Sequence, residues 1–323
     1  MKVGLRLYEC SDEQLKYAQQ IGVESGLVPL SAVLGYKEKG YPDMENLMAL
    51  KERFSSHGLE IAGIELPHSH LQHVLLGQPG RDRELDDVCR TIRALGDAGI
   101  PALVFDLIIS LLPSGGAMPG YWANPEGRGG AVLRAFDYAR AQATMDAPAG
   151  EVRDDEVWSR VTTFYEKVVP EAERAGVRLA CHPDDPPMPS YRGVSQVLNS
   201  VEGFKHLLER VPSPCHGLLF CIGTLQESGA DVLEAIRYFG ARDRIVVVHF
   251  RNVRGIIPRY DEVFLDNGDL DMWKVMRAFK EVGYEGTFVP DHTPRIIGDT
   301  PWGHIGRAWA VGYIKALIAA ATS

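Results

Sequence analysis

Short runs of apolar and β-branched residues alternate with longer amphipathic stretches along nearly the whole chain. The short runs have the length of strands and lie at positions 3–8, 23–27, 60–66, 102–107, 177–182, 217–222, 245–250 and 287–291. The longer stretches repeat apolar residues at helical spacing and lie at 12–21, 43–57, 81–98, 151–175, 201–211, 230–239, 270–282 and 304–320. Glycines stand just after most of the helical stretches, where helices commonly end. This regular alternation predicts a parallel sheet whose strands are connected by helices.

Eight strand–helix units in a chain of 323 residues predict an α/β protein built as one (β/α)8 TIM barrel that spans residues 1–323. An open doubly wound sheet is the structural rival, but no G-x-G-x-x-G turn follows the first predicted strand. Positions 110–150 are rich in Gly, Pro and Ala and form too long a connection for an ordinary loop. We expect an insertion after the fourth strand that lies over the barrel mouth as a lid or an oligomer contact.

Charge and cysteine usage narrow the class of partner. The formal net charge of -9 repels phosphate backbones, so we expect no nucleic-acid partner. The five cysteines are scattered and do not form the pattern of a disulfide framework. The sequence contains no apolar run of membrane-spanning length and no secretory signal at its start, so we expect a cytoplasmic protein without membrane contact.

Metal-binding side chains stand at the carboxyl ends of the last four predicted strands. They are His182, Cys221, His249 and Asp291. Active sites of TIM barrels lie at this rim, and two imidazoles, a thiolate and a carboxylate suit a divalent metal ion. A single histidine or cysteine at a strand end is more commonly a packing or hydrogen-bonded residue. The occurrence of all four at one rim therefore predicts a metal site.

Several motifs resemble those of the mannonate dehydratase family. They are HPDDPP at 182–187, FCIGTL at 220–225, VHFRNVRG at 248–255, DNGDLDM at 266–272 and PDH at 290–292. The resemblance implies a barrel of the xylose-isomerase-like group and removal of water from D-mannonate to give 2-keto-3-deoxy-D-gluconate. It also implies one divalent metal ion, with Mn²⁺ expected first and Fe²⁺, Co²⁺ or Zn²⁺ also compatible with the donors. The family's metal ligands fall on the same four residues, and its catalytic histidine falls on His292.

A sugar-acid substrate carries a carboxylate, which needs a cationic partner. A thiolate and an aspartate together cancel the charge of a divalent ion, so we expect arginines near the metal to hold the substrate carboxylate. Arg251, also a catalytic candidate, Arg254 and Arg6 are placed for this role, although Arg254 is also compatible with a solvated loop charge. Further candidates for substrate contact are Tyr8, His70, Asp184, Asp185 and Asn252. Asp184 and Asp185 also suit orientation of His182 or capping of the loop.

Three functional classes stay open at this level. The first is a metal-dependent hydro-lyase, and the second is a sugar isomerase or epimerase on the same barrel, for which harder, carboxylate-rich ligand sets are usual. The third is a non-catalytic relative that binds a sugar acid, because the family's catalytic tyrosine has no counterpart here before Tyr313. In each case we expect a small-molecule sugar acid or related polyol as partner and a homo-oligomer, a dimer or a tetramer.

Overall fold

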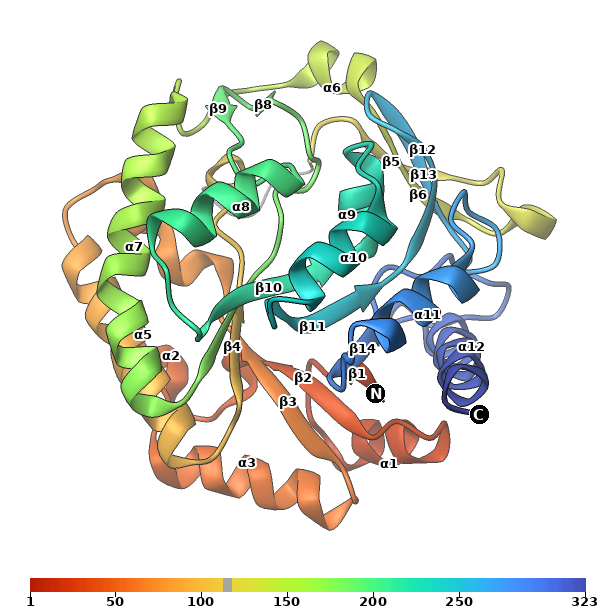
Figure 1. Cartoon of the computed structure of the whole chain (residues 1–323), viewed down its shortest axis with the longest axis horizontal. Helices are drawn as coiled ribbons and strands as arrows, with labels where there is room; N and C mark the ends of the chain where they lie inside the picture. Colours follow the sequence, from red (N-terminus) through yellow and green to blue (C-terminus); the bar gives the residue numbers. More distant parts are fainter. Residues whose placement is uncertain (113–117) are drawn as a thin grey trace.

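Eight parallel strands close into a barrel at the centre of the molecule (Figure 1). The computed structural model describes residues 1–112 and 118–323. Around the barrel, the strands follow chain order and the last pairs with the first. The barrel strands are β1 (Lys2–Arg6), β2 (Ser25–Pro29), β3 (Glu60–Glu65), β4 (Ala102–Phe105), β7 (Arg178–Cys181), β10 (His216–Cys221), β11 (Ile245–Phe250) and β14 (Thr287–Pro290).

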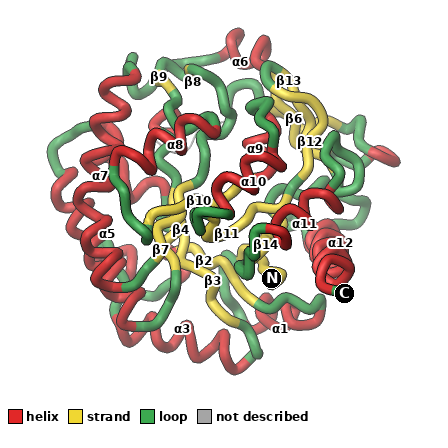
Figure 2. The backbone as a smooth tube through the Cα atoms, in the orientation of Figure 1, coloured by secondary structure: helices red, strands yellow, loops and turns green. Residues whose placement is uncertain are grey.

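Long helices surround the barrel and follow its strands in turn (Figure 2). They are α1 (Asp12–Gln20), α3 (Met44–Ser56), α5 (Arg81–Asp97), α7 (Asp154–Ala175), α8 (Val201–Arg210), α10 (Val232–Gly240), α11 (Met272–Glu281) and α12 (His304–Thr322). The TIM-barrel prediction is confirmed, and each predicted strand and helix overlaps an observed one.

Local chemistry starts several of these helices. The side chains of Ser11, Ser200, Asp231 and Asp271 accept hydrogen bonds from backbone N–H groups in the first turns of α1, α8, α10 and α11. These caps satisfy donors that the helix itself leaves unpaired. They fix where each helix begins and therefore how long each preceding loop is.

Alternation along the strands divides the barrel's apolar residues into two layers. One cluster fills the barrel interior and consists of Leu27, Val104, Ala180, Leu219, Cys221, Val247 and Val289. A larger cluster, which includes Cys181 and Phe220, packs between the strands and the outer helices. Successive residues of a strand face opposite sides of the sheet. Ala180 and Cys221 therefore face the barrel interior, whereas the residues next to them, Cys181 and Phe220, pack toward the helices.

A second sheet covers one side of the barrel mouth (Figure 1). It is antiparallel, and its order is β12 (Asn252–Ile256), β13 (Arg259–Val263), β6 (Leu133–Asp137) and β5 (Tyr121–Asn124). The predicted insertion after β4 thus pairs with a hairpin that follows β11, although the sequence patterns predicted no strand there. Part of the insertion, 113–117, lies outside the described residues. A small apolar cluster that includes Phe136, Met188 and Tyr260 packs beneath this sheet.

Shorter elements complete the connections. They are η1 (Leu30–Ala32), α2 (Tyr36–Lys39), η2 (His68–Leu71), α4 (Gln72–Leu76), η3 (Ile109–Leu111), η4 (Arg128–Gly130), α6 (Tyr138–Thr144), β8 (Ser190–Tyr191), β9 (Val194–Ser195) and α9 (Ile222–Glu227). Among the helices that the structure describes, none combines the length and the apolar character needed to cross a bilayer.

Candidate metal centre

Three of the predicted metal ligands meet at the carboxyl ends of adjacent barrel strands. One ligand atom from each of His182, Cys221 and His249 lies within 4.8 Å of the other two. Cys221 and His249 are register partners on β10 and β11, and His182 follows β7 directly. Two ligand atoms bound to one ion at about 2.0–2.3 Å stand no more than about 4.5 Å apart. The spacing of the three residues is therefore close to that of a coordinated set.

Asp291 lies beside this group at the end of β14. Its Oδ2 atom is 3.6 Å from His249 Nδ1 and 3.1 Å from Arg251 Nε. Its exposed fraction is 9%. The fourth predicted ligand thus adjoins the cluster through His249 and lies outside the closest set of three.

The hydrogen bonds of the two histidines fit a bound cation. His182 Nδ1 is 2.6 Å from the carbonyl oxygen of Pro183, so it donates there and leaves Nε2 available to a metal ion. His249 is buried, and neither of its ring nitrogens has a hydrogen-bond partner among the described residues. A buried polar atom without a partner is costly, and a metal ion would satisfy it.

Arg251 sets the charge around the cluster. Its side chain is 1% exposed, and it contacts oxygens of Asp185 at 2.8 Å, Glu227 at 2.7 Å, Glu262 at 3.0 Å and Asp291 at 3.1 Å. Its Nε also lies 3.4 Å from Cys221 Sγ. Burial raises the pKa of the Cys221 thiol, but the positive charges of Arg251 and His182 lower this pKa well below its usual range. The cysteine is therefore held as a thiolate, the form that binds metal ions.

The guanidinium of Arg251 thus bonds to side chains of the protein itself. The sequence had suggested Arg251 as a catalytic group and a partner for the substrate carboxylate. In the structure its donors face buried carboxylates, so Arg251 is placed to organise the site.

His292 is paired with a buried carboxylate. Its Nδ1 lies 2.6 Å from Glu262 Oε2 and 2.9 Å from Arg134 Nη1. Nδ1 either donates to Glu262 or accepts from Arg134. We assign the proton to Nδ1, because its contact with the anionic Glu262 is the shorter one. In this tautomer Nε2 carries no proton, and it lies 3.7 Å from Asp291 Oδ1.

A cavity of about 510 Å³ lies beside His292. It is lined by Met118, Tyr121, Trp122, Ala123, Val132, Leu133, Arg134, His292, Thr293, Arg295, Pro301, Trp302, Gly303 and Arg307. This lining contains three arginines and, among the described residues, no aspartate or glutamate. The cavity is therefore suited to an anionic ligand.

Arg6, Tyr8 and Asp184, which were also predicted to contact substrate, are not among the residues that line this cavity. Arg6 forms a bidentate ion pair with Glu65 and stacks over the ring of Tyr8 at 4.9 Å. Asp184 accepts a hydrogen bond from the backbone N–H of Leu198 at 2.8 Å, and burial raises its pKa to about 7. It therefore stabilises the loop after β7.

Asp185 is bonded within the protein as well. It accepts hydrogen bonds from the hydroxyl of Tyr121 at 2.5 Å and from Arg251 Nη2 at 2.8 Å. Asp185 thus links the insertion to the charged network beneath the metal cluster.

Asn252 and Arg254 do not present free groups to the cavity. Asn252 is fully buried, and its amide donates to the carbonyl oxygens of Leu265 and Leu270 at 2.9 and 3.0 Å. Arg254 is exposed on β12 and pairs with Asp261 at 3.1 Å. Asn252 thus stabilises the packing of a loop, and Arg254 lies on the surface of the hairpin. Neither residue lines the cavity in which we expected both to bind substrate.

The histidines after β3 differ in their surroundings. His70 Nδ1 is 2.8 Å from the hydroxyl of Tyr36. His68 Nδ1 is 2.5 Å from Asp106 Oδ1, and its Nε2 is buried without a partner in the part of the chain that the structure describes. Asp106 follows Phe105, the register partner of the residue before His182. The His68–Asp106 pair therefore lies on the same rim as the metal cluster.

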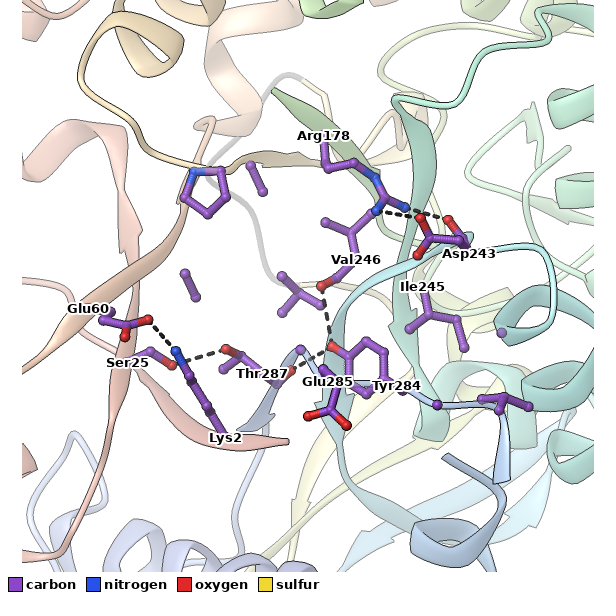
Figure 3. Close-up of a pocket in the computed structure, with 18 of the residues that line it drawn as sticks. Lys2, Ser25, Glu60, Arg178, Asp243, Ile245, Val246, Tyr284, Glu285 and Thr287 are labelled. Carbon is purple, nitrogen blue, oxygen red and sulfur yellow. Dashed lines mark hydrogen bonds and ion pairs between the residues drawn. The ribbon is translucent and has the colours of Figure 1, made fainter. Parts of the chain in front are cut away.

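A second cavity of about 510 Å³ lies at the opposite, amino-terminal end of the barrel (Figure 3). Four of its charged groups form two ion pairs, Lys2 with Glu60 and Arg178 with Asp243, and Glu285 pairs with the amino terminus of Met1. Since catalytic groups of TIM barrels come from the carboxyl ends of the strands, we assign the chemistry to the first cavity.

Comparison with known proteins agrees with the geometry. Residues 137–323 match a family model described as D-mannonate dehydratase. The mannonate dehydratase of Thermotoga maritima is 31% identical over 309 residues, which cover 84% of both chains. The chain belongs to the mannonate dehydratase family. The resemblance predicted from the motifs is thus confirmed, and the chain is an enzyme of the hydro-lyase class that dehydrates a sugar acid.

Solved structures support the same assignment. The crystal structure of a mannonate dehydratase from Streptococcus suis serotype 2 has a TM-score of 0.87 and 27% identity, and it covers 100% of this chain and 93% of its own. A xylose isomerase domain protein from Alicyclobacillus acidocaldarius has a TM-score of 0.67 at 17% identity, a similarity of fold alone.

Several residues that line the cavity come from segments far along the chain from the metal-binding motifs, and sequence patterns did not identify them. Arg134 and Tyr121 lie in the insertion, and Trp302 and Arg307 flank the start of α12. They reach the site through the pairing of β6 with β13 and through the return of the chain after β14. For Arg307, its place soon after the PDH motif was the available signal.

Proposed function

We propose that the chain is a metal-dependent dehydratase of D-mannonate or a closely related sugar acid. In this proposal His182, Cys221, His249 and Asp291 hold one divalent cation at the barrel mouth. The observation that carries it is the largely buried His–Cys–His cluster on three adjacent strand ends, next to a cavity lined by arginines. Membership of the mannonate dehydratase family supports the same reaction.

We propose Mn²⁺ as the native ion. A divalent cation would polarise substrate oxygens and stabilise the negative charge that develops as the proton next to the carboxylate leaves. Two imidazoles, a thiolate and a carboxylate also accept Fe²⁺, Co²⁺ or Zn²⁺, so availability contributes to the choice.

Proton transfer is assigned to His292. Glu262 accepts a hydrogen bond from Nδ1 at 2.6 Å, which orients the ring. The side chain is 38% exposed and lines the cavity, so a substrate reaches it. A histidine works as an acid or a base near neutral pH.

An elimination moves two protons, one taken from carbon and one given to the leaving hydroxyl group. We assign the second transfer to His68, because Asp106 orients it and its Nε2 has no partner among the described residues. Burial lowers the pKa of His68, but the Asp106 carboxylate has the opposite effect and the pKa lies above its usual value. A histidine that stays protonated is suited to the role of the acid.

Arg251 is proposed to be a positioning residue, since its donors hold Asp185, Glu227 and Glu262 around the cluster. We further propose a cytoplasmic homo-oligomer. The cysteines are unpaired in the structure, as is usual in a reducing compartment.

The test is to incubate the pure protein with Mn²⁺ and a panel of aldonates and to weigh the products by mass spectrometry. The proposal predicts a product lighter by one water from D-mannonate or a close stereoisomer. A product of unchanged mass would instead indicate an isomerase or epimerase. Thermal stabilisation by an aldonate without any product would indicate a non-catalytic binding protein.

A further inference from the structure

One arginine of the cavity lacks a carboxylate partner although it is partly buried. The Arg307 guanidinium donates to the backbone carbonyl oxygens of Trp302 at 2.8 Å and Asp291 at 3.4 Å. No ion pair to Arg307 occurs among the described residues. An arginine has five N–H donors in a planar fork, so most of its donors remain available.

The other arginines near the mouth have their charges compensated. Arg6 is bonded to Glu65, Arg134 to Glu262 and Arg251 to several carboxylates. Arg295 also lines the cavity, but it is exposed. Arg307 is thus the cavity arginine with both partial burial and an uncompensated charge.

Trp302 supplies a second unused donor in the same cavity. Its indole Nε1 is buried and has no hydrogen-bond partner in the described part of the chain. The Arg307 guanidinium lies over its ring at 5.1 Å, which holds the two side chains together. An indole N–H donates and does not accept, so it suits an anionic oxygen.

The electrostatics of the cavity support an anion at this point. A carboxylate placed here would compensate the charge. The backbone contact with Asp291 puts Arg307 directly beside the predicted metal ligand.

We propose that Arg307 and Trp302 form the subsite that binds the substrate carboxylate. This inference rests on the proposed function, because it assumes that the ligand of the cavity is a sugar acid. It replaces Arg251, Arg254 and Arg6 in that role. In this subsite Trp302 binds and orients the substrate, and the histidines transfer the protons. The subsite makes the cavity selective for acids over neutral sugars.

The test measures binding separately from turnover. Titration calorimetry with D-mannonate and with the neutral alditol D-mannitol is carried out on Mn²⁺-loaded protein with the wild-type subsite and on Arg307→Met, Arg307→Lys and Trp302→Phe, each in a His292→Asn background that suppresses turnover of D-mannonate. Arg254→Met is the matched control, because it removes an arginine from the exposed hairpin. Metal content and circular dichroism are measured for each protein.

We expect Arg307→Met to weaken D-mannonate binding about 10- to 100-fold and to leave D-mannitol binding unchanged, as for the loss of a charged hydrogen-bonded pair. Arg307→Lys is expected to recover part of the loss, and Trp302→Phe to weaken binding about 3- to 10-fold. Arg254→Met should bind like the wild type.

Wild-type affinity for D-mannonate in a folded Arg307→Met protein with normal metal content would overturn the subsite. If that variant does not fold, Arg307→Lys and Trp302→Phe decide, and wild-type affinity in both would overturn it. If Arg307 controls acid binding but no aldonate is dehydrated, the subsite stands and the proposed reaction fails. If an aldonate is dehydrated equally well by the wild type and by Arg307→Met, the proposed reaction stands and the subsite fails.

Discussion

At the scale of single residues, the site combines two histidines that are each oriented by a carboxylate. His292 is held by Glu262 and His68 by Asp106. His292 could be predicted from its position after Asp291 and from the family motif. His68 could not be singled out, because its partner Asp106 lies 38 positions further along the chain and no local pattern connects them.

Replacing His292 by asparagine should abolish most of the turnover. We expect His292→Asn to lower kcat about 10²- to 10⁴-fold, the usual contribution of a general acid or base, while metal content stays at the wild-type level. Steady-state kinetics and elemental analysis measure both. Wild-type kcat in this variant would rule out His292 as the proton-transfer group.

Replacing His68 by asparagine tests the second histidine–carboxylate pair. We expect His68→Asn to lower kcat about 10²-fold with little change in KM. His73→Asn is the matched control, because His73 pairs with Glu84 and its side chain is 45% exposed. Equal kcat values for the two variants would show that His68 has no role in proton transfer.

At the scale of elements, the barrel strands could be predicted because they are short, buried and separated by helical patterns. The β12–β13 hairpin could not, since NVRGIIPRYDEV mixes charged and apolar residues and pairs with β6, which lies more than 100 positions earlier. The same pairing brings Tyr121 and Arg134 to the site. Local sequence does not encode a contact of this range.

The loop after β13 depends on Asn252. Asn252→Ala removes amide hydrogen bonds to Leu265 and Leu270, so we expect the free energy of unfolding to fall by about 1–3 kcal/mol. KM for the sugar acid should not change, because the amide does not face the cavity. Urea unfolding and kinetics test both effects. A raised KM at unchanged stability would restore Asn252 as a substrate-binding residue.

At the scale of the whole molecule, the fold carries a buried histidine that makes stability depend on pH. His216 is fully buried at the start of β10 and stacks on Tyr165, with ring centroids 4.1 Å apart. Burial lowers the pKa of His216 from 6.5 to about 4. The folded state thus binds this proton less readily than the unfolded state, so the contribution of His216 is complete above pH 6.5 and is lost as the pH falls toward 4.

Comparison with His216→Phe isolates this effect from other titrating groups. The stability of the wild type minus that of the variant should fall by about 1.4 kcal/mol for each pH unit between about 6.5 and 4. Urea unfolding at several pH values measures the difference. A difference that does not vary with pH would show that His216 titrates normally in the folded protein.

In the proposed metal site, Cys221, His182 and His249 bind one metal ion together. Cobalt titration followed by absorption spectroscopy tests it most directly, because a cysteine thiolate bound to Co²⁺ gives a charge-transfer band. We predict saturation of this band at one Co²⁺ per chain in the wild type and in Cys89→Ser, and loss of the band in Cys221→Ser. A band of undiminished intensity in Cys221→Ser, or its absence from the wild type at saturating Co²⁺, would show that these three residues do not share a metal ion.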